Sequence, residues 1–400
     1  MKKLFLLLPF FYSSFGYSQT IVDSKFGKGL MNVIAEDSSW SMKLGFRIQT
    51  LFIGDWNIND TEGIESGNSE ALIRRSRLKF GGFAFSPKVQ YKIELGLSNK
   101  DLGGASQYTN GAPRLILDAV VKWNFYKNLT LWAGQTKLPG NRERVISSAN
   151  LQFVDRSLLN SNFNIDRDVG IQIRNHHTVG KQFLIREMYS ISSGEGRNIV
   201  GDNLGGYKHT ARVEILPFGK FISKGDFTGG DTKREESPKL SLAATYDYHD
   251  RAVKNKSNQG SYMVNDQGLF ETNITTVFID AMFKYKGFSI MSEYANRASE
   301  NPLAINSDGS LTGAEVGVGF STNFQLGYLL KSNWEFAGRY TTVNWDKIIT
   351  GKESQNQYTF GASKYIVGHK LKVQSDLSYL TTNNSSDSNL MYRMQFELHF

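Results

Sequence analysis

Hydrophobic and polar residues alternate with a period of two along nearly the whole chain. The last segment shows the pattern most clearly, because Tyr392, Met394, Phe396 and Leu398 share one parity while charged and amide residues hold the other. The alternation recurs from about residue 40 onward, and no segment sustains the period of about 3.6 that an amphipathic helix requires. The pattern therefore predicts an all-β protein whose strands have two unlike faces.

Sixteen strands are expected, and the connections between them alternate in length. The expected strands cover residues 40–52, 72–82, 88–98, 114–124, 128–135, 168–175, 182–193, 208–216, 239–249, 275–286, 287–297, 314–330, 333–343, 355–366, 369–381 and 389–400. Long polar connections at 53–71, 99–113, 136–167, 194–207, 250–274, 298–313, 344–354 and 382–388 alternate with tight turns. The connection 217–238 breaks this rule, because it is long yet falls on the side that otherwise carries turns, and its residues assign it no role.

This asymmetry between the two ends favours a barrel that crosses a membrane. After residue 19 no run of about 20 apolar residues occurs, so no helical span is expected. Transmembrane strands need only about 9 to 11 residues, apolar on one side, and a closed sheet leaves no backbone edge in lipid. A soluble β-sandwich is the alternative, but it has no reason to carry loops at one end and turns at the other. We predict a transmembrane antiparallel β-barrel of about sixteen strands, with long extracellular loops and short periplasmic turns.

The first 18 residues are expected to be an export signal that does not belong to the fold. Lys2 and Lys3 form a basic start, an apolar stretch follows, and small residues precede Gln19. Residues 19–39 are then expected to be a periplasmic segment and residues 40–400 the barrel, with an inward-folding loop at about 136–167. The chain contains no cysteine, which excludes a disulfide framework.

The charge of the chain suggests what passes through the barrel. The net charge is +8, and without the two lysines of the acid-free segment 1–18 it is +6. If the apolar parity faces lipid, the opposite parity lines a lumen with more Lys and Arg than Asp and Glu. Sixteen strands are wide enough for an aqueous channel, and Arg or Lys at a narrowing selects anions.

The candidate narrowing is the connection 136–167, supported by two arginines on an early strand. The candidate pore residues are Lys137, Arg142, Arg144, Arg156, Arg167, Arg75 and Arg77. Arginine's planar fork suits phosphate oxygens. The alternative is that Arg156 and Arg167 pair with nearby acids and hold the loop to the wall, whereas Arg142 and Arg144 are the stronger candidates for unpaired charge.

Catalytic and cofactor motifs are missing from the sequence. No nucleotide-binding, zinc-protease or nucleophile-elbow motif occurs, and the six histidines have no metal spacing, so neither a cofactor nor a metal is expected. Nucleic-acid binding is disfavoured because the bases are spread over many strands. We predict that the chain is not an enzyme. The competing interpretation is a barrel hydrolase, for which His249 beside Asp247 and Asp250 is the nearest approach to a catalytic group.

Several motifs along the chain resemble the phosphate-selective porin O and P family, in the form common in Bacteroidetes-type envelopes. The most specific block is Gly134-Gln135-Thr136-Lys137-Leu138-Pro139-Gly140, followed by Arg144, Ser147-Ser148, Leu151, Phe153, Asp155-Arg156-Ser157 and Arg167-Asp168-Val169-Gly170. Supporting blocks are Arg75-Ser76-Arg77, Leu117-Asp118-Ala119, Lys284-Tyr285-Lys286-Gly287-Phe288-Ser289, Glu293-Tyr294 and Gln325-Leu326-Gly327-Tyr328.

The resemblance implies a homotrimeric sixteen-stranded porin in the outer membrane of a diderm bacterium, surrounded by lipid. It implies passive diffusion of small hydrophilic solutes with a preference for anions, phosphate and pyrophosphate among them, and a terminal Phe400 that the barrel-assembly machinery reads. Acids interleave with the bases in this chain, unlike the dense arginine ladder of the family's tightest members. A general diffusion porin without selectivity is therefore a further alternative.

Overall fold

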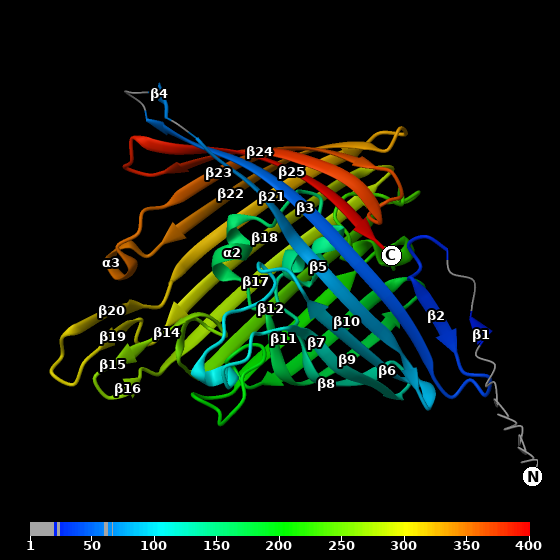
Figure 1. The fold of residues 1–400 in the computed structure, drawn as a ribbon, viewed down its shortest axis with the longest axis horizontal. Helices are drawn as coiled ribbons and strands as arrows, with labels where there is room; N and C mark the ends of the chain where they lie inside the picture. The colour runs from blue at the N-terminus through cyan, green and yellow to red at the C-terminus, as the bar shows by residue number, and fades with distance from the viewer. Residues whose placement is uncertain (1–19, 22–24, 60–62, 66) are drawn as a thin grey trace, which may run out of the picture.

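The computed structural model describes residues 20–21, 25–59, 63–65 and 67–400, and its body is a closed antiparallel β-barrel (Figure 1). The sixteen strands of the barrel are β3 (Ser41–Asn59), β5 (Asn68–Ala84), β6 (Ser86–Gly96), β7 (Ile116–Tyr126), β8 (Leu129–Lys137), β9 (Arg167–Val179), β10 (Phe183–Ser192), β11 (Lys208–Leu216), β12 (Lys239–Ala252), β17 (Thr272–Tyr285), β18 (Phe288–Ser299), β21 (Gly319–Leu329), β22 (Trp334–Trp345), β23 (Gln355–Tyr365), β24 (Leu371–Thr382) and β25 (Asp387–His399). Each strand pairs with the next, and β25 closes the ring on β3 in the register Gln395↔Leu51. The expected export signal at 1–18 lies outside the described residues.

The expected barrel is confirmed, and the largest differences from the expected strands lie at the loop end. The first strand continues to Asn59 instead of ending at residue 52, because it stays paired with both neighbouring strands, with Asp55 opposite Asn68 of β5 and Asn59 opposite Asp387 of β25. The polar residues of this extension resemble a loop in sequence. The expected strand 314–330 begins only at Gly319, whose φ of +137° interrupts the extended chain.

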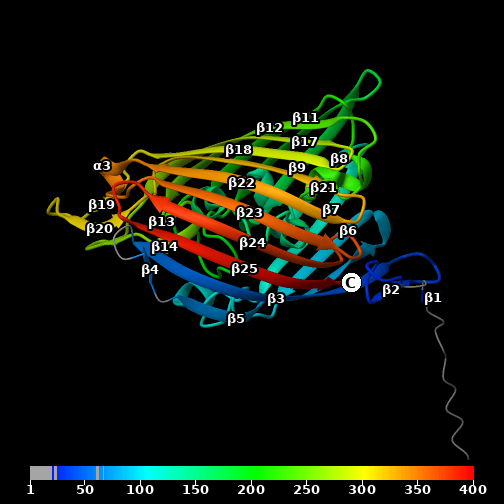
Figure 2. The ribbon, with the colours of Figure 1, turned by 90° about the horizontal axis from the view of Figure 1, so that it is seen from above.

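Short elements occupy the connections. They are β1 (Thr20–Ile21), β2 (Met31–Ile34), β4 (Gly63–Ile64), β13 (Lys254–Lys256), β14 (Gln259–Tyr262), β15 (Val264–Asn265), β16 (Gly268–Leu269), β19 (Leu303–Ile305), β20 (Leu311–Glu315), α1 (Arg142–Val145), α2 (Leu158–Phe163), α3 (Lys347–Thr350) and the 3₁₀ turns Gln107–Thr109, Ser148–Asn150 and Ile222–Phe227. Within the described part of the chain, no helix has the length and apolar character needed to cross a membrane. The C-terminus and β2 lie at one end of the barrel, and α3 with the hairpin β19–β20 lies at the other (Figures 1 and 2).

The barrel strands expose apolar side chains on the outer face and bury polar side chains on the inner face, which is the reverse of a soluble protein. In β25, Tyr392 and Phe396 are 39% and 44% exposed on the outer face, whereas Glu397 on the inner face is 1% exposed. The exposed large hydrophobic residues of the other strands follow the same alternation. A barrel with an apolar exterior and a polar lumen is what a hydrocarbon environment demands of β-structure.

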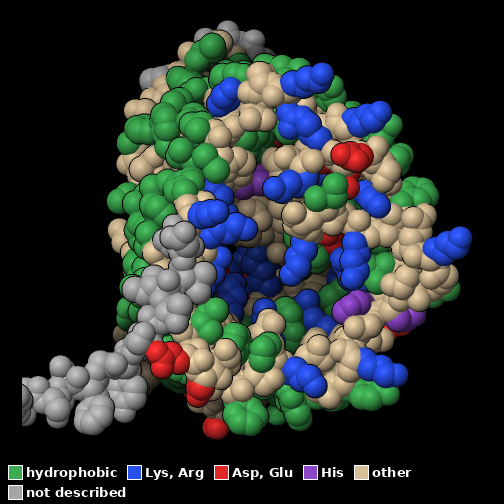
Figure 3. Space-filling view, turned by 90° about the vertical axis from the view of Figure 1, so that its right-hand side faces the viewer, with side chains coloured by type: hydrophobic (Ala, Val, Ile, Leu, Met, Phe, Trp, Pro, Cys, Tyr) green, Lys and Arg blue, Asp and Glu red, His purple; other side chains and the backbone are tan. Residues whose placement is uncertain are grey.

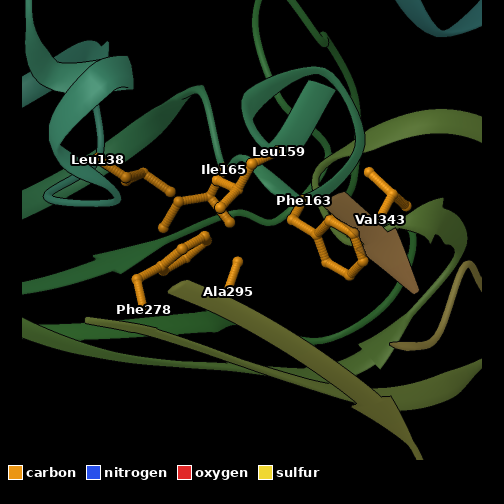
Figure 4. Packing of buried hydrophobic residues seen from close by; sticks show 7 residues of the cluster. All are labelled: Leu138, Leu159, Phe163, Ile165, Phe278, Ala295 and Val343. Atoms are coloured by element: carbon orange, nitrogen blue, oxygen red, sulfur yellow. The ribbon is translucent and has the colours of Figure 1, made fainter. Parts of the chain in front are cut away.

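The segment between β8 and β9 folds into the ring and brings an apolar core with it (Figures 1 and 4). Its fully buried residues Leu159 and Phe163, both on α2, pack against Phe278 of β17 and Val343 of β22. Burying a side chain of this size stabilises the packed state by about 1.5–3 kcal/mol. The inner face of β17 and β22 is therefore apolar where α2 covers it, and the loop fills this half of the lumen.

Candidate functional site

The inward loop, residues 138–166, is held to the far wall by a buried ion-pair cluster around Arg142 of α1. Arg142 is 0% exposed, and its guanidinium lies 3.0 Å from Oε1 of Glu214 on β11 and 3.2 Å from Oδ1 of Asp280 on β17. Arg212 also pairs with both acids. Arg142 therefore fixes the loop in place and lies off the channel surface.

Further polar contacts continue this attachment along the loop. Oε1 of Glu293 accepts a hydrogen bond of 2.7 Å from the backbone N–H of Glu143, and Gln152 donates one of 2.8 Å to Glu335. The Ser157 hydroxyl caps α2 by accepting from the Asn160 N–H. Since these partners come from separate strands and buried donors are costly to leave unpaired, the loop has one well-defined position.

The long connection 217–238 also enters the barrel, from the end that carries the turns. Nζ of Lys284 donates to the carbonyl oxygens of Gly225 at 2.7 Å and Thr228 at 2.8 Å. The N–H of Gly229 donates to the Asn150 carbonyl of the inward loop at 2.5 Å, and a Cβ on Gly229 would lie 2.4 Å from the Gln152 nitrogen. The connection is thus part of the lumenal filling, a role that its sequence did not reveal.

The two inserted segments leave a cavity of about 1470 Å³ between the inward loop and the wall formed by β5 to β11. Figure 3 looks into the end of the barrel that carries the turns and shows this hollow with many Lys and Arg side chains around it. Nineteen bases line the cavity: Arg74, Arg75, Arg77, Lys79, Lys88, Lys92, Lys100, Lys122, Lys137, Arg144, Arg156, Arg167, Arg174, Arg186, Arg197, Arg212, Lys220, Lys224 and Arg393. The seven acids that line it are Glu94, Asp101, Asp118, Asp155, Asp166, Glu214 and Asp226.

All seven of these acids are already paired with a base. Arg77 holds Glu94 at 3.0 Å, and Arg167 holds Asp118 at 3.2 Å. Asp155 pairs with two arginines of β5. The remaining pairs are Arg77 with Asp101, Arg144 with Asp166, Arg186 with Asp226 and Arg212 with Glu214. Such pairing cancels charge locally, so the field in the cavity comes from the bases that have no carboxylate partner.

Nine cavity-lining bases have no ion pair with a described acid: Lys88, Lys100, Lys122, Lys137, Arg156, Arg174, Arg197, Lys220 and Lys224. Arg156 donates to the carbonyl oxygens of Glu143 at 3.0 Å and Ile146 at 2.9 Å. Lys137 donates to the carbonyl oxygens of Arg144 at 2.7 Å and Ile146 at 3.1 Å. Carbonyl groups hold these two cations in position beside the cavity without supplying a negative charge.

The expected pairing of the loop arginines is therefore corrected. Arg142 and Arg144, expected to be unpaired, both form ion pairs, while Arg156 has no carboxylate partner among the described residues. Arg167 pairs with Asp118 and Asp166, as the alternative held. The physical reason is that α1 turns Arg142 toward the wall, whereas the loop carbonyls converge on Arg156.

Arg75 and Arg77 lie on the cavity side of β5, where both are paired with acids. Arg75 contacts Asp155 of the inward loop, and Arg77 contacts Asp101 of the connection 97–115. Sequence reasoning placed neither Lys220 nor Lys224 in the channel, because both lie in the connection 217–238 and not on a strand. Strand alternation carries no signal for them.

Charge pairing also fixes the ionisation of the loop acids. Burial by itself favours a neutral carboxyl, but the neighbouring Arg144 and Arg167 charges outweigh it and hold the pKa of Asp166 well below its usual range. Asp155 behaves in the same way beside Arg75 and Arg74, which keep its pKa low. Both acids therefore stay ionised at neutral pH and keep cancelling part of the basic charge.

The pKa of Glu195, a carboxyl on the loop side of the barrel, shifts in the opposite direction. Glu195, in the connection 193–207, is 2% exposed, and burial, reinforced by the charge of Asp168, raises its pKa to about 7. Its Oε1 has no hydrogen-bond partner among the described residues. Ionisation of Glu195 is thus disfavoured while the connection is packed and unhindered once it opens. The packed state therefore becomes less stable as the pH rises from 4.5, the pKa of the carboxyl in the opened chain, through about 7, its pKa in the packed chain.

We therefore expect amides of the connection 193–207 to exchange faster as the pH is raised from about 5 to about 8, after correction for the intrinsic rate. Glu195→Gln should remove this dependence, because the amide cannot ionise. Hydrogen exchange measured on both proteins tests the prediction, with Glu300→Gln, an exposed acid, as the control. Equal pH profiles for the wild type and Glu195→Gln would contradict it.

Comparison with known proteins adds a family and a set of related folds. The model of the family "phosphate-selective porin O and P" matches residues 42–400. The outer membrane channel DcaP of Acinetobacter baumannii is 12% identical, with a TM-score of 0.54 over 92% of this chain and 99% of that one. An anion-selective porin from Comamonas acidovorans is 11% identical, with a TM-score of 0.52 over 90% and 100%. No curated protein sequence matches, and at these identities the structural likeness establishes the fold alone.

Proposed function

This chain belongs to the phosphate-selective porin O and P family, and from that premise we propose an anion-preferring diffusion channel. It is an outer-membrane porin of a bacterium, and its solutes are small and hydrophilic. The observation that carries the anion preference is the set of nine cavity-lining bases without a carboxylate partner, against acids that are all paired. Phosphate and pyrophosphate are solutes that these bases would favour.

The inserted segments confine solutes to the cavity beside β5 to β11, where uncompensated charge lies close to their path. Low-dielectric walls strengthen the field of such charges, which raises the local concentration of anions and lowers that of cations. A general diffusion porin without selectivity would need this field to be balanced, and the charges of the cavity do not support that alternative.

A hydrolase built on the barrel has less support. His249 lies 3.2 Å from the Ser257 hydroxyl, but both side chains are buried, 1% and 0% exposed. The carboxylate of Asp247 is engaged by Lys208 and by the Thr210 hydroxyl instead of orienting the histidine. A serine nucleophile needs an oriented base and access to substrate, so we propose that the protein is a channel without catalytic activity.

Membership of the family also supports proposals on assembly and orientation. We propose that the apolar exterior contacts outer-membrane lipid, that the barrel forms a homotrimer, and that Phe400 is read by the barrel-assembly machinery. Residues 1–18 would then be removed on export, and the turn end, with residues 19–39 and the C-terminus, would face the periplasm. The connection 136–167 would act as the constriction and the other long connections as extracellular loops.

Proteoliposome swelling with solutes of matched size tests the proposal. Gluconate, glucose and glucosamine have nearly the same dimensions but carry charges of −1, 0 and +1. We expect the purified porin to admit gluconate fastest and glucosamine slowest, by a combined factor of about ten. Equal rates would favour the non-selective alternative, and faster entry of glucosamine would contradict the proposal.

A further inference from the structure

Two of the unpaired bases are held by a single aromatic ring inside the channel. Trp132 of β8 points into the lumen, and both Nζ of Lys122 on β7 and Cζ of Arg174 on β9 lie 3.9 Å from the centroid of its ring. All three residues line the cavity. Since β8 pairs with β7 on one side and with β9 on the other, the two cations reach the indole from neighbouring strands.

The contacts of this cluster position the cations without neutralising them. Arg174 donates through Nε at 3.1 Å and Nη2 at 2.7 Å to the amide oxygen of Gln172, a neutral partner. Gln172 is itself fixed by its bond of 3.0 Å to the Lys137 carbonyl oxygen. An ion pair would cancel the charge of Arg174, whereas an indole face and an amide leave it intact.

Each of the two cations keeps hydrogen-bond donors that are free to bind a solute. Nη1 of Arg174 and the ammonium group of Lys122 have no hydrogen-bond partner in the described part of the chain. The indole lies between the two strands that supply them, and their separation is at most twice the 3.9 Å distance to the ring centroid. A compact anion can contact one of them closely, but an anion with two separated charges can contact both.

We propose that Lys122, Trp132 and Arg174 form a binding station for elongated dianions, which carry two oxyanion groups on a short backbone. The station lies in the half of β7, β8 and β9 nearest the turns, between the turn-side opening and the inward loop. The free Nη1 of Arg174 donates to one oxyanion group, and the Lys122 ammonium adds a point charge for the other. The proposal deepens the proposed function, on which it rests, by naming a solute class and the residues that recognise it.

The test is block of chloride current through the purified wild-type porin in a planar bilayer. At pH 7 succinate serves as the elongated dianion, pyrophosphate as an elongated anion of higher charge, and sulfate as the compact dianion. In Trp132→Leu the two cations lose their common support, and in Lys122→Gln one of them is gone. We expect both variants to weaken block by pyrophosphate and by succinate about tenfold, and block by sulfate much less.

A matched control is Trp123→Leu, because Trp123 is 49% exposed on the outer face of β7, next to Lys122. The added anions should block the current of this variant as strongly as that of the wild type. A retained chloride conductance in each variant shows that the barrel has assembled. Equal block of the wild type and Lys122→Gln by all three anions would overturn the station. That result would leave the proposed function standing if the wild-type current is still carried mainly by chloride, whereas a current carried mainly by cations would overturn the function itself.

Discussion

Replacing Lys137 and Arg156 together by glutamine should lower the ratio of chloride to potassium permeability about tenfold. Both cations lie where the inward loop begins and turns back, and both are held by loop carbonyl oxygens. At 4 Å from a solute, a unit charge contributes roughly 1 to 4 kcal/mol as the effective dielectric constant falls from about 80 to about 20. Removing two such charges would therefore account for the expected loss of anion preference.

The control for this prediction removes the same net charge outside the channel. Lys331 and Lys364 lie at or beside the turn between β21 and β22, and neither lines the cavity. Their double glutamine variant should keep the wild-type permeability ratio, as measured by the zero-current potential in a salt gradient. An equal loss of anion preference in the two double variants would contradict the importance of the loop charges.

Arg142→Met should release the inward loop while the barrel remains closed. Removing one partner from a buried ion-pair cluster costs about 3–5 kcal/mol, because the remaining carboxylates lose compensation. Arg212 still pairs with Glu214 and Asp280, which places the expected cost near the lower end of this range. We expect a larger and noisier single-channel conductance and faster proteolysis within residues 138–166.

Arg251→Met is the matched control for this variant. Arg251 also pairs with a carboxylate, at 3.3 Å from Asp250, but its side chain is 58% exposed. Exposed pairs of this kind contribute about 0–1 kcal/mol, so conductance, noise and proteolysis should stay at wild-type values. If Arg142→Met showed the same conductance, current noise and rate of proteolysis as Arg251→Met, the buried ion-pair cluster would not be what holds the loop.

The barrel could be predicted from the sequence because its physical cause is local. Every residue of β25 faces either the exterior or the lumen of the barrel, so Tyr392 and Phe396 alternate with Arg393 and Glu397. This pattern can be recognised without knowledge of any other strand. The same alternation assigns Lys122 and Arg174 to the lumenal face. It did not reveal that Trp132 joins them, since a lumenal tryptophan breaks the pattern of polar residues.

The filling of the lumen could not be predicted in the same way, because it depends on contacts between distant segments. Whether Arg142 or Arg156 is paired depends on how α1 faces Glu214 and Asp280, far away in sequence. One signal was nevertheless present. Phe278 has lumenal parity on β17 yet is apolar, and such a position marks where an inserted segment packs.

We infer that unpaired bases beside the inward loop make this porin prefer anions. The most direct measurement of that preference is the zero-current potential of the purified wild-type protein in a planar bilayer under a potassium chloride gradient. We expect a potential displaced toward the equilibrium potential of chloride. A potential at zero, or displaced toward that of potassium, would contradict it.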